Sequence, residues 1–187
     1  RLCGTSSGAC FSEFGVDVVC VDKDQVKIDR LNDGIIPIFE PGLEDFFSKN
    51  VKAGRLQFTT DIKAAVSGAD AVFICVGTPT DSVSGHADLS YVYAAARDIG
   101  EALDGYSVIV IKSTVPVGTG DKVERVIKKS CADADFDVVS NPEFLREGSA
   151  INDFMRPDRI VIGSESQRAQ EVMRNLYRPL FLIETPI

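Results

Sequence analysis

The stretch Ser140-Asn-Pro-Glu-Phe-Leu-Arg-Glu-Gly148 gathers charged side chains that could do chemistry. Glu143 and Glu147 are four residues apart and would share one face if the stretch is helical. Arg146 lies beside them, and its planar guanidinium matches the geometry of a phosphate. Because the stretch follows a predicted strand, a binding or catalytic site is favoured over the alternative, an ordinary charged helix start.

Asp22 is a second candidate, since it ends the apolar run Val18-Val-Cys-Val-Asp22. A carboxylate at the carboxyl end of a strand can accept hydrogen bonds from the adenosine ribose hydroxyls, and it disfavours a 2′-phosphate. This pattern predicts NAD in preference to NADP. The alternative, with about equal weight, is that Asp22 is the N-cap of the next helix.

The glycine turn that should accompany Asp22 is incomplete. Gly4-Thr-Ser-Ser-Gly8 keeps two glycines at an unusual spacing, and only three residues precede it. A dinucleotide-binding loop uses its glycines for a tight turn, close approach of the pyrophosphate and helix–strand packing. We therefore expect Gly4 and Gly8 to form a shortened cofactor turn, with the usual first strand absent or nearly so.

Two polar loops follow strongly apolar runs, Val76-Gly-Thr-Pro-Thr80 and Ile111-Lys-Ser-Thr-Val-Pro-Val-Gly-Thr119. Gly77 and Thr78 would form either a simple turn or a loop at the carboxyl edge of the sheet that contacts phosphate or ribose. Thr114 is predicted at a strand tip. The alternative is a connecting loop whose hydroxyls cap the following helix, a role that suits Thr119.

The elements that must position these residues alternate along the chain. Strands are predicted at 17–21, 56–59, 71–76, 107–111, 136–139 and 159–162, and helices at 7–14, 24–32, 43–53, 62–67, 89–103, 121–129 and 167–176. Several strands are continuously apolar, as in parallel sheets covered on both faces. This order predicts a doubly wound, Rossmann-like α/β fold with a mostly parallel sheet and helices on both faces.

Composition narrows the function. The 187 residues include 28 acidic and 20 basic side chains, a net charge of −8, which argues against nucleic acid or an anionic membrane as a partner. No apolar run approaches the roughly 20 residues of a membrane span. The five cysteines are scattered, as reduced thiols in a cytoplasmic protein would be. His86 is the single histidine and is expected in a surface loop, so no metal site is predicted.

Six motifs then appear in a characteristic order. They are Ser7-Gly-Ala-Cys10, Val21-Asp-Lys-Asp24 with Lys27, Phe39-Glu-Pro-Gly42, Cys75-Val-Gly-Thr-Pro79, Lys112-Ser-Thr-Val-Pro116 and Asn141-Pro-Glu-Phe-Leu-Arg-Glu147. Over nearly the whole chain this set resembles the UDP-glucose/GDP-mannose dehydrogenase family, above all its bacterial members that oxidise UDP-glucose. The resemblance implies two hydride transfers to NAD that convert the sugar 6-hydroxymethyl group to a carboxylate. The alternatives are a GDP-mannose or UDP-N-acetyl-sugar 6-dehydrogenase, or a noncatalytic nucleotide-binding module.

The resemblance also implies residue roles. Asp22 and Lys27 would hold the adenosine ribose, and Thr78, Thr114 and Glu147 would contact the cofactor near the reaction. The segment that meets the nucleotide sugar is Glu143, Phe144, Leu145, Arg146 and Glu147. Glu143 would be the general acid/base of a later hydrolytic step, while Thr114 and Glu147 would orient water.

The same resemblance defines the expected domain. Residues 1–187 would be the NAD-binding domain, with the central helix and the C-terminal substrate domain outside this chain. The family's nucleophilic cysteine belongs to that later domain, so none of the five cysteines is assigned as a nucleophile. We therefore expect this chain to be inactive by itself and the whole enzyme to form a homodimer or a higher oligomer.

Overall fold

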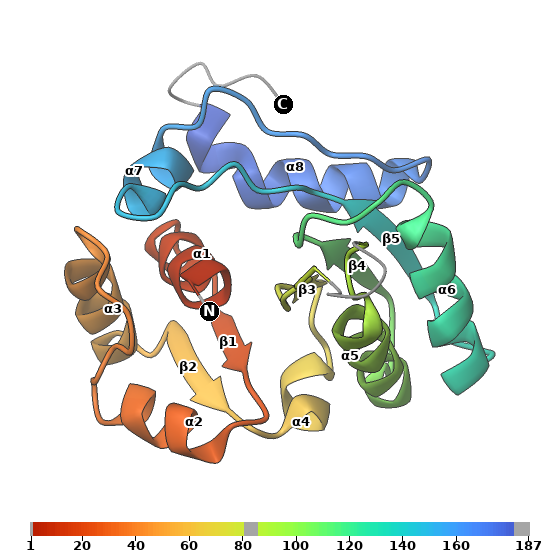
Figure 1. Ribbon diagram of the computed structural model, residues 1–187, viewed down its shortest axis with the longest axis horizontal. Coiled ribbons are helices and arrows are strands. Elements are labelled where there is room, and N and C mark those ends of the chain that lie inside the picture. The colour runs from red at the N-terminus through yellow and green to blue at the C-terminus, as the bar shows by residue number, and fades with distance from the viewer. Residues whose placement is uncertain (1, 81–85, 182–187) are drawn as a thin grey trace. The chain divides into compact units, whose positions relative to one another are not determined.

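The computed structural model describes residues 2–80 and 86–181 of the chain. They divide into two compact units. Unit 1 comprises Arg1–Asp61, Phe144–Ile160 and Leu176–Ile187, and unit 2 comprises Ile62–Glu143 and Val161–Asn175. Figure 1 labels the helices and strands of both units.

Unit 1 contains a parallel pair of strands with helices. Its elements are α1 (Leu2–Glu13), β1 (Val18–Val21), α2 (Gln25–Asn32), α3 (Leu43–Lys52), β2 (Leu56–Thr59) and α7 (Ala150–Met155). The strands β1 and β2 pair in parallel, with Val18 opposite Leu56. Aromatic rings fill much of the core: Phe11 meets Phe154 edge-on at 4.9 Å between ring centroids.

Unit 2 contains a three-stranded parallel sheet in the order β3-β4-β5. Its elements are α4 (Ile62–Val66), β3 (Ala71–Ile74), α5 (Ser90–Ala102), β4 (Ser107–Ile111), α6 (Thr119–Ser130) and β5 (Phe136–Ser140). Helix α8 (Gln167–Phe181) begins in unit 2, and its last residues from Leu176 belong to unit 1.

Strand β4 is buried on both faces, which explains its continuous apolar sequence. Ile109 and Ile111 belong to a core cluster with residues of α4, α5 and α6. Val108 and Val110 point to the opposite face, because strand side chains alternate, and they are also fully buried. The predicted Rossmann-like α/β fold is thereby confirmed, although its strands pair in two sheets, one in each unit.

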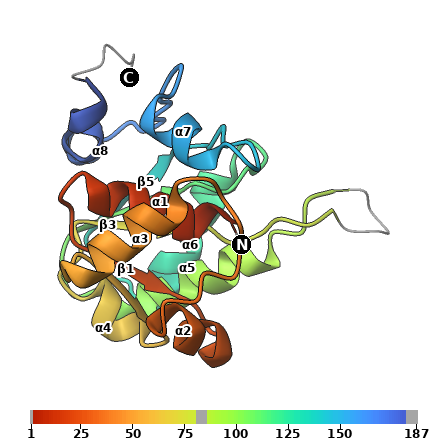
Figure 2. The same ribbon diagram turned by 90° about the vertical axis from the view of Figure 1, so that its left-hand side faces the viewer.

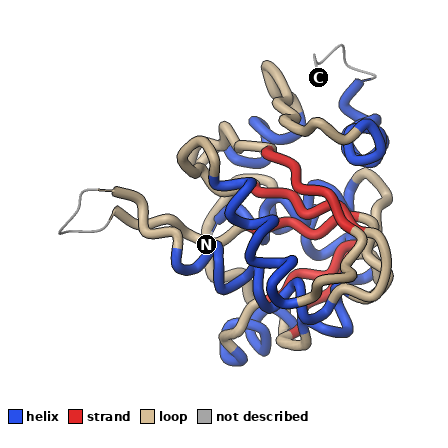
Figure 3. The backbone as a smooth tube through the Cα atoms, turned by 90° about the vertical axis from the view of Figure 1, so that its right-hand side faces the viewer, coloured by secondary structure: helices blue, strands red, loops and turns tan. Residues whose placement is uncertain are grey.

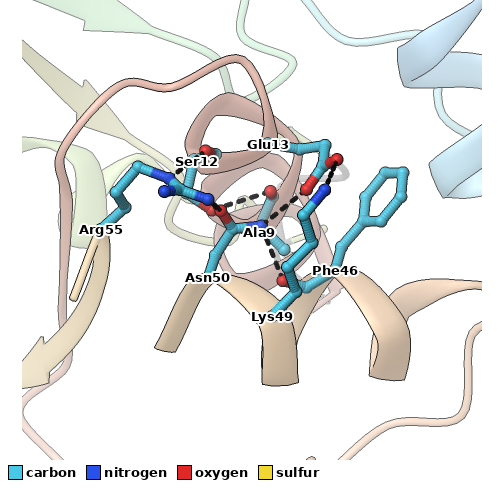
Figure 4. A network of polar contacts seen from close by, with 7 residues as sticks. All are labelled: Ala9, Ser12, Glu13, Phe46, Lys49, Asn50 and Arg55. Atoms are coloured by element: carbon cyan, nitrogen blue, oxygen red, sulfur yellow. Dashed lines mark hydrogen bonds and ion pairs between the residues drawn. The ribbon is translucent and has the colours of Figure 1, made fainter. Parts of the chain in front are cut away.

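A polar network joins α1 to α3 in unit 1 (Figure 4). Asn50 is fully buried and donates to Glu13 Oε2 at 2.9 Å and to the Phe46 carbonyl at 2.8 Å. Its amide oxygen accepts two hydrogen bonds from Arg55, at 3.1 and 2.7 Å. Arg55 also donates to the Ser12 carbonyl in the last turn of α1, at 3.2 Å. The network satisfies the buried amide and holds the end of α1.

One predicted strand is wrong, and one helix was not predicted. Residues 159–162 form no strand, since the only ladder contact there is an isolated antiparallel bridge between Ser140 and Gly163. Val161 is tied instead to the residue that follows β5, because Asn141 Nδ2 donates to the Val161 carbonyl at 2.8 Å. Helix α7 follows Ser149 in the stretch where no helix was predicted.

The surface loop predicted around His86 lies only partly within the described residues, because 81–85 fall outside them. The segments on either side of that gap run side by side and are joined by an antiparallel bridge between Thr80 and Ala87. Both stand out from the body of unit 2 in Figures 2 and 3. His86 is exposed, as expected.

Candidate functional site

Asp22 lies immediately after β1 and forms an ion pair with Lys27, so the two residues predicted to hold a ribose are in contact. The other carboxylate oxygen accepts a hydrogen bond from the Asp24 N–H at 3.1 Å. The N-cap of α2 is Asp24, whose side chain accepts from the Lys27 N–H at 3.2 Å. The alternative reading of Asp22 as the helix N-cap is therefore wrong.

Gly4 and Gly8 do not form a turn: both lie within α1, which begins at Leu2 and not at Ser7 as predicted. Gly8 is needed for packing. A Cβ atom built on Gly8 would lie 2.7 Å from Cys20 Sγ, so a larger residue would force the Cys20 side chain or α1 to shift. Their assignment to the cofactor stays a prediction, but the predicted shortened glycine turn is wrong.

Gly77, Thr78 and Thr114 come together in unit 2, in the loops that follow β3 and β4. The Thr78 hydroxyl donates to the Thr114 carbonyl at 3.1 Å. Ser113 reinforces this pairing, since its hydroxyl donates to the Val76 carbonyl. The two predicted cofactor loops are thus neighbours at the carboxyl edge of the sheet, where open α/β sheets bind their ligands.

Glu143 also belongs to unit 2, and its Oε2 atom is buried without a hydrogen-bond partner among the described residues. Residues 141–146 have no regular secondary structure and 147–149 form a turn. The prediction that Glu143 and Glu147 share a helical face is therefore wrong. A buried acceptor with no donor is costly, and such groups in native proteins call for an explanation such as a ligand.

The rest of the predicted sugar segment, Phe144–Glu147, belongs to unit 1. Arg146 makes an ion pair with Asp153, with Nη2 and Oδ1 at 2.7 Å, and its backbone N–H reaches Oδ2 of the same carboxylate at 2.9 Å. Arg159 stands 5.3 Å from the centroid of the Phe144 ring. Arg146 thus has an intramolecular anion, Asp153, as its partner.

Three buried polar residues near these segments had no role in the sequence-based prediction. Lys112 and Asn141 follow β4 and β5, with Nζ and Oδ1 3.5 Å apart, and each is less than 5% exposed. Glu40 is 5% exposed and accepts two backbone hydrogen bonds from residues 148 and 150. All three stand in motifs that the sequence displays, but burial was the signal needed to single them out.

Neither a metal cluster nor a membrane-spanning helix is found among residues 2–80 and 86–181. In that part of the chain no group of three or more His, Cys, Asp or Glu side chains could hold a metal ion. No helix there is both long and apolar enough to cross a membrane.

Comparison with known proteins identifies the class. Residues 2–181 match the model of the UDP-glucose/GDP-mannose dehydrogenase family, NAD binding domain, and the chain belongs to this family. UDP-glucose 6-dehydrogenase of Rhizobium meliloti (strain 1021) is 61% identical over 98% of the chain and 43% of that relative. UDP-glucose 6-dehydrogenase TuaD of Bacillus subtilis (strain 168) is 55% identical over 94% of the chain and 38% of that relative. The chain therefore spans less than half the length of these two relatives.

Solved structures agree. A UDP-glucose dehydrogenase from the archaeon Pyrobaculum islandicum superposes with a TM-score of 0.91 at 41% identity, covering 95% of this chain and 42% of that one. A ternary complex of GDP-mannose dehydrogenase from Pseudomonas aeruginosa has a TM-score of 0.93 at 38% identity, covering 100% of this chain and 44% of that one. The fold is thus that of the nucleotide-sugar dehydrogenases.

Proposed function

We propose that the full-length gene product is an NAD-dependent UDP-glucose 6-dehydrogenase, in which this chain supplies the cofactor domain and part of the sugar-nucleotide site. The observation that carries the proposal is the 61% identity, over 98% of the chain, to a relative of that name. Two successive two-electron oxidations, with entry of one water, would convert the C6 hydroxymethyl group of UDP-glucose to the carboxylate of UDP-glucuronate.

The residues around Asp22 fit NAD. A carboxylate has about four lone-pair positions, and Asp22 uses its two oxygens for one contact each, with the Asp24 N–H and with Lys27. Acceptor capacity therefore remains for the adenosine ribose hydroxyls, while the negative charge disfavours a 2′-phosphate. NAD, when bound, supplies the hydride acceptor.

Proton handling falls to the residues of the sugar segment. We assign Glu143 as general acid/base, because its buried Oε2 atom has no donor in the described part of the chain. Thr114 and Glu147 would orient water, and Phe144–Glu147 would meet the nucleotide sugar. The nucleophilic cysteine implied by the family resemblance is expected in the later substrate domain. The chain alone should therefore not complete the reaction.

The proposal also covers the cellular location and the oligomeric state. A cytoplasmic location is supported by Cys10, Cys20, Cys75 and Cys131, which are thiols and not disulfides. A homodimer or higher oligomer is proposed from the family resemblance and is tested by sedimentation of the full-length protein.

The test is an initial-rate assay of the full-length protein with NAD and a panel of nucleotide sugars. We expect formation of two NADH per UDP-glucose consumed, with UDP-glucuronate as product. A higher kcat/KM for GDP-mannose or for a UDP-N-acetyl sugar would replace the proposed substrate. Tight NAD binding without oxidation of any sugar would replace the enzyme by a noncatalytic nucleotide-binding module.

Two variants test the assigned roles. Glu143→Gln should lower kcat about a hundredfold, the low end of the range for a lost general acid/base. Glu101→Gln, at an exposed position of α5 in the same unit, should leave kcat unchanged.

Asp22→Asn should weaken NAD binding and reduce the preference for NAD over NADP, whereas Asp24→Asn retains a good helix cap and should do neither.

A further inference from the structure

Glu40 connects two segments of unit 1 that are far apart in sequence. Its Oε2 atom accepts a hydrogen bond from the Gly148 N–H at 3.0 Å, and its Oε1 atom accepts one from the Ala150 N–H at 2.5 Å. The residue is 5% exposed, so the carboxylate is almost withdrawn from water. A buried carboxylate is tolerated where donors of this kind surround it.

The segment around Gly148, which donates to Glu40, makes few hydrogen bonds between its own backbone groups. Between Phe144 and Ser149 the Ser149 N–H donates to the Arg146 carbonyl at 3.1 Å, and the Ser149 carbonyl accepts from the Asp153 N–H of α7 at 2.8 Å. The Arg146 N–H goes to the Asp153 side chain instead. Gly148 has a left-handed backbone, with φ +80°. Since the segment lacks a helical or strand ladder, its conformation depends on the side chains that bind its N–H groups.

Glu40 is itself held firmly. Its carbonyl accepts the Leu43 N–H at 3.1 Å, and Gly42, with φ +81°, turns the chain into α3. A Cβ on Gly42 would lie 3.6 Å from Ile151 Cγ2, so this turn packs directly on α7. Phe39, the preceding residue, is 92% exposed, whereas Glu40 is buried, so these two neighbouring side chains point to opposite sides of the chain. The backbone that carries the Glu40 carboxylate is therefore held in place by a hydrogen bond and by packing.

We propose that Glu40 is a positioning residue that holds the segment Phe144–Glu147 in the conformation that receives the nucleotide sugar. The inference rests on the proposed function, which assigns this segment to the sugar. Glu40 fixes the exit of the segment at residues 148 and 150, while Asp153 fixes Arg146 within it. Loss of Glu40 should therefore weaken binding of the nucleotide sugar. It should leave the ion pair of Asp22 and Lys27, proposed to bind the ribose, intact.

The test compares Glu40→Gln, Glu40→Asp and the control Glu44→Gln in the full-length protein. A glutamine has the same shape but only one acceptor oxygen, so one of the two N–H groups loses its partner. We expect the KM for UDP-glucose to rise about tenfold in Glu40→Gln, the effect of one unsatisfied buried donor. The KM for NAD should stay within about twofold. Glu40→Asp keeps both oxygens and should recover part of the loss. Glu44→Gln, at an exposed position in the first turn of α3, should leave both KM values unchanged.

A second measurement separates this inference from the proposed function. In amide-resolved hydrogen exchange, at least one of the Gly148 and Ala150 amides should lose protection in Glu40→Gln, and neither should in Glu44→Gln, whatever the protein oxidises. An unchanged sugar KM in a protein that oxidises UDP-glucose would overturn the proposal, and so would an equal rise in both KM values. Unchanged protection at both amides would overturn it even if no sugar is oxidised. If Glu40→Gln does not fold, Glu40→Asp is judged by the same readouts.

Discussion

The charge of Asp22 is set by opposing effects. Its side chain is 34% exposed, and partial burial by itself raises the pKa of the carboxyl group. Hydrogen bonds from Lys27 and from the Asp24 N–H outweigh this, and the pKa lies below the ordinary value of 3.8. Asp22 is therefore ionised at neutral pH, as its proposed role at the adenosine ribose requires.

This shift predicts a pH dependence. Because the folded pKa of Asp22 lies below 3.8, its ionised form adds stability that is fully present above the unfolded pKa. That stability is lost as the pH falls through the folded pKa. In Lys27→Met the strongest lowering contact is gone, so the pKa should rise. Carboxyl-carbon NMR titration measures both values; Lys52→Met, at an exposed site, is the control. An unchanged Asp22 midpoint in Lys27→Met would contradict the ion pair.

Residue types were easier to predict than their partners. Asp22 and Lys27 were assigned to one site from sequence, and they are in contact. Arg146 was assigned to an anionic ligand, whereas its guanidinium meets Asp153, seven residues further on. Sequence spacing could reveal neither that pairing nor the burial of Glu40, because both depend on how an irregular segment folds back on itself.

At the level of elements, the least expected feature is the continuous helix over Gly4 and Gly8. Glycine in a helix interior costs about 1 kcal/mol relative to alanine. The sequence was therefore read as a turn. Close packing of α1 on β1 offsets this cost, since a Cβ added at Gly8 would overlap Cys20 Sγ at 2.7 Å. The need for a small residue comes from tertiary contact and is invisible in local propensity.

Gly8→Ala tests this packing. The new Cβ would meet Cys20 Sγ at 2.7 Å, so we expect a net loss of ~1 kcal/mol in the free energy of unfolding, after the gain in helix propensity. Removing the sulfur with Cys20→Ala should reverse the sign of the Gly8→Ala effect. Urea unfolding of the two single variants and the double variant gives the cycle. Equal effects of Gly8→Ala in both backgrounds would show that the contact with Cys20 is unimportant.

The network around Asn50 predicts a larger effect. Asn50→Ala removes partners from Glu13 and from the Arg55 guanidinium at a fully buried position. Unfolding free energy should fall by about 2–4 kcal/mol. Lys49→Ala removes only an ion pair whose lysine side chain is 61% exposed, and it should cost less than about 1 kcal/mol. Equal losses in thermal or urea unfolding would contradict the importance given to Asn50.

For the whole molecule, the alternation of apolar runs was sufficient to predict the fold class. Burial on both faces of β4 makes its sequence continuously apolar, and this signal is strong. The division into two units was not predicted, because the chain passes from one to the other at four points, including the bond between Glu143 and Phe144. Such boundaries carry no linker composition, and only long-range contacts define them.

The hydrogen bond between Thr78 and the Thr114 carbonyl has a consequence for selectivity. A hydroxyl has a single hydrogen, and that of Thr78 is already donated. While that bond is kept, its oxygen only accepts, and a ligand hydrogen-bonded to it would supply the proton. An ionised pyrophosphate brings none, whereas a sugar hydroxyl does. In its proposed cofactor role, the side chain of Thr78 would thus favour the alcohol groups of a nucleotide over its phosphates, through the polarity of one hydrogen bond.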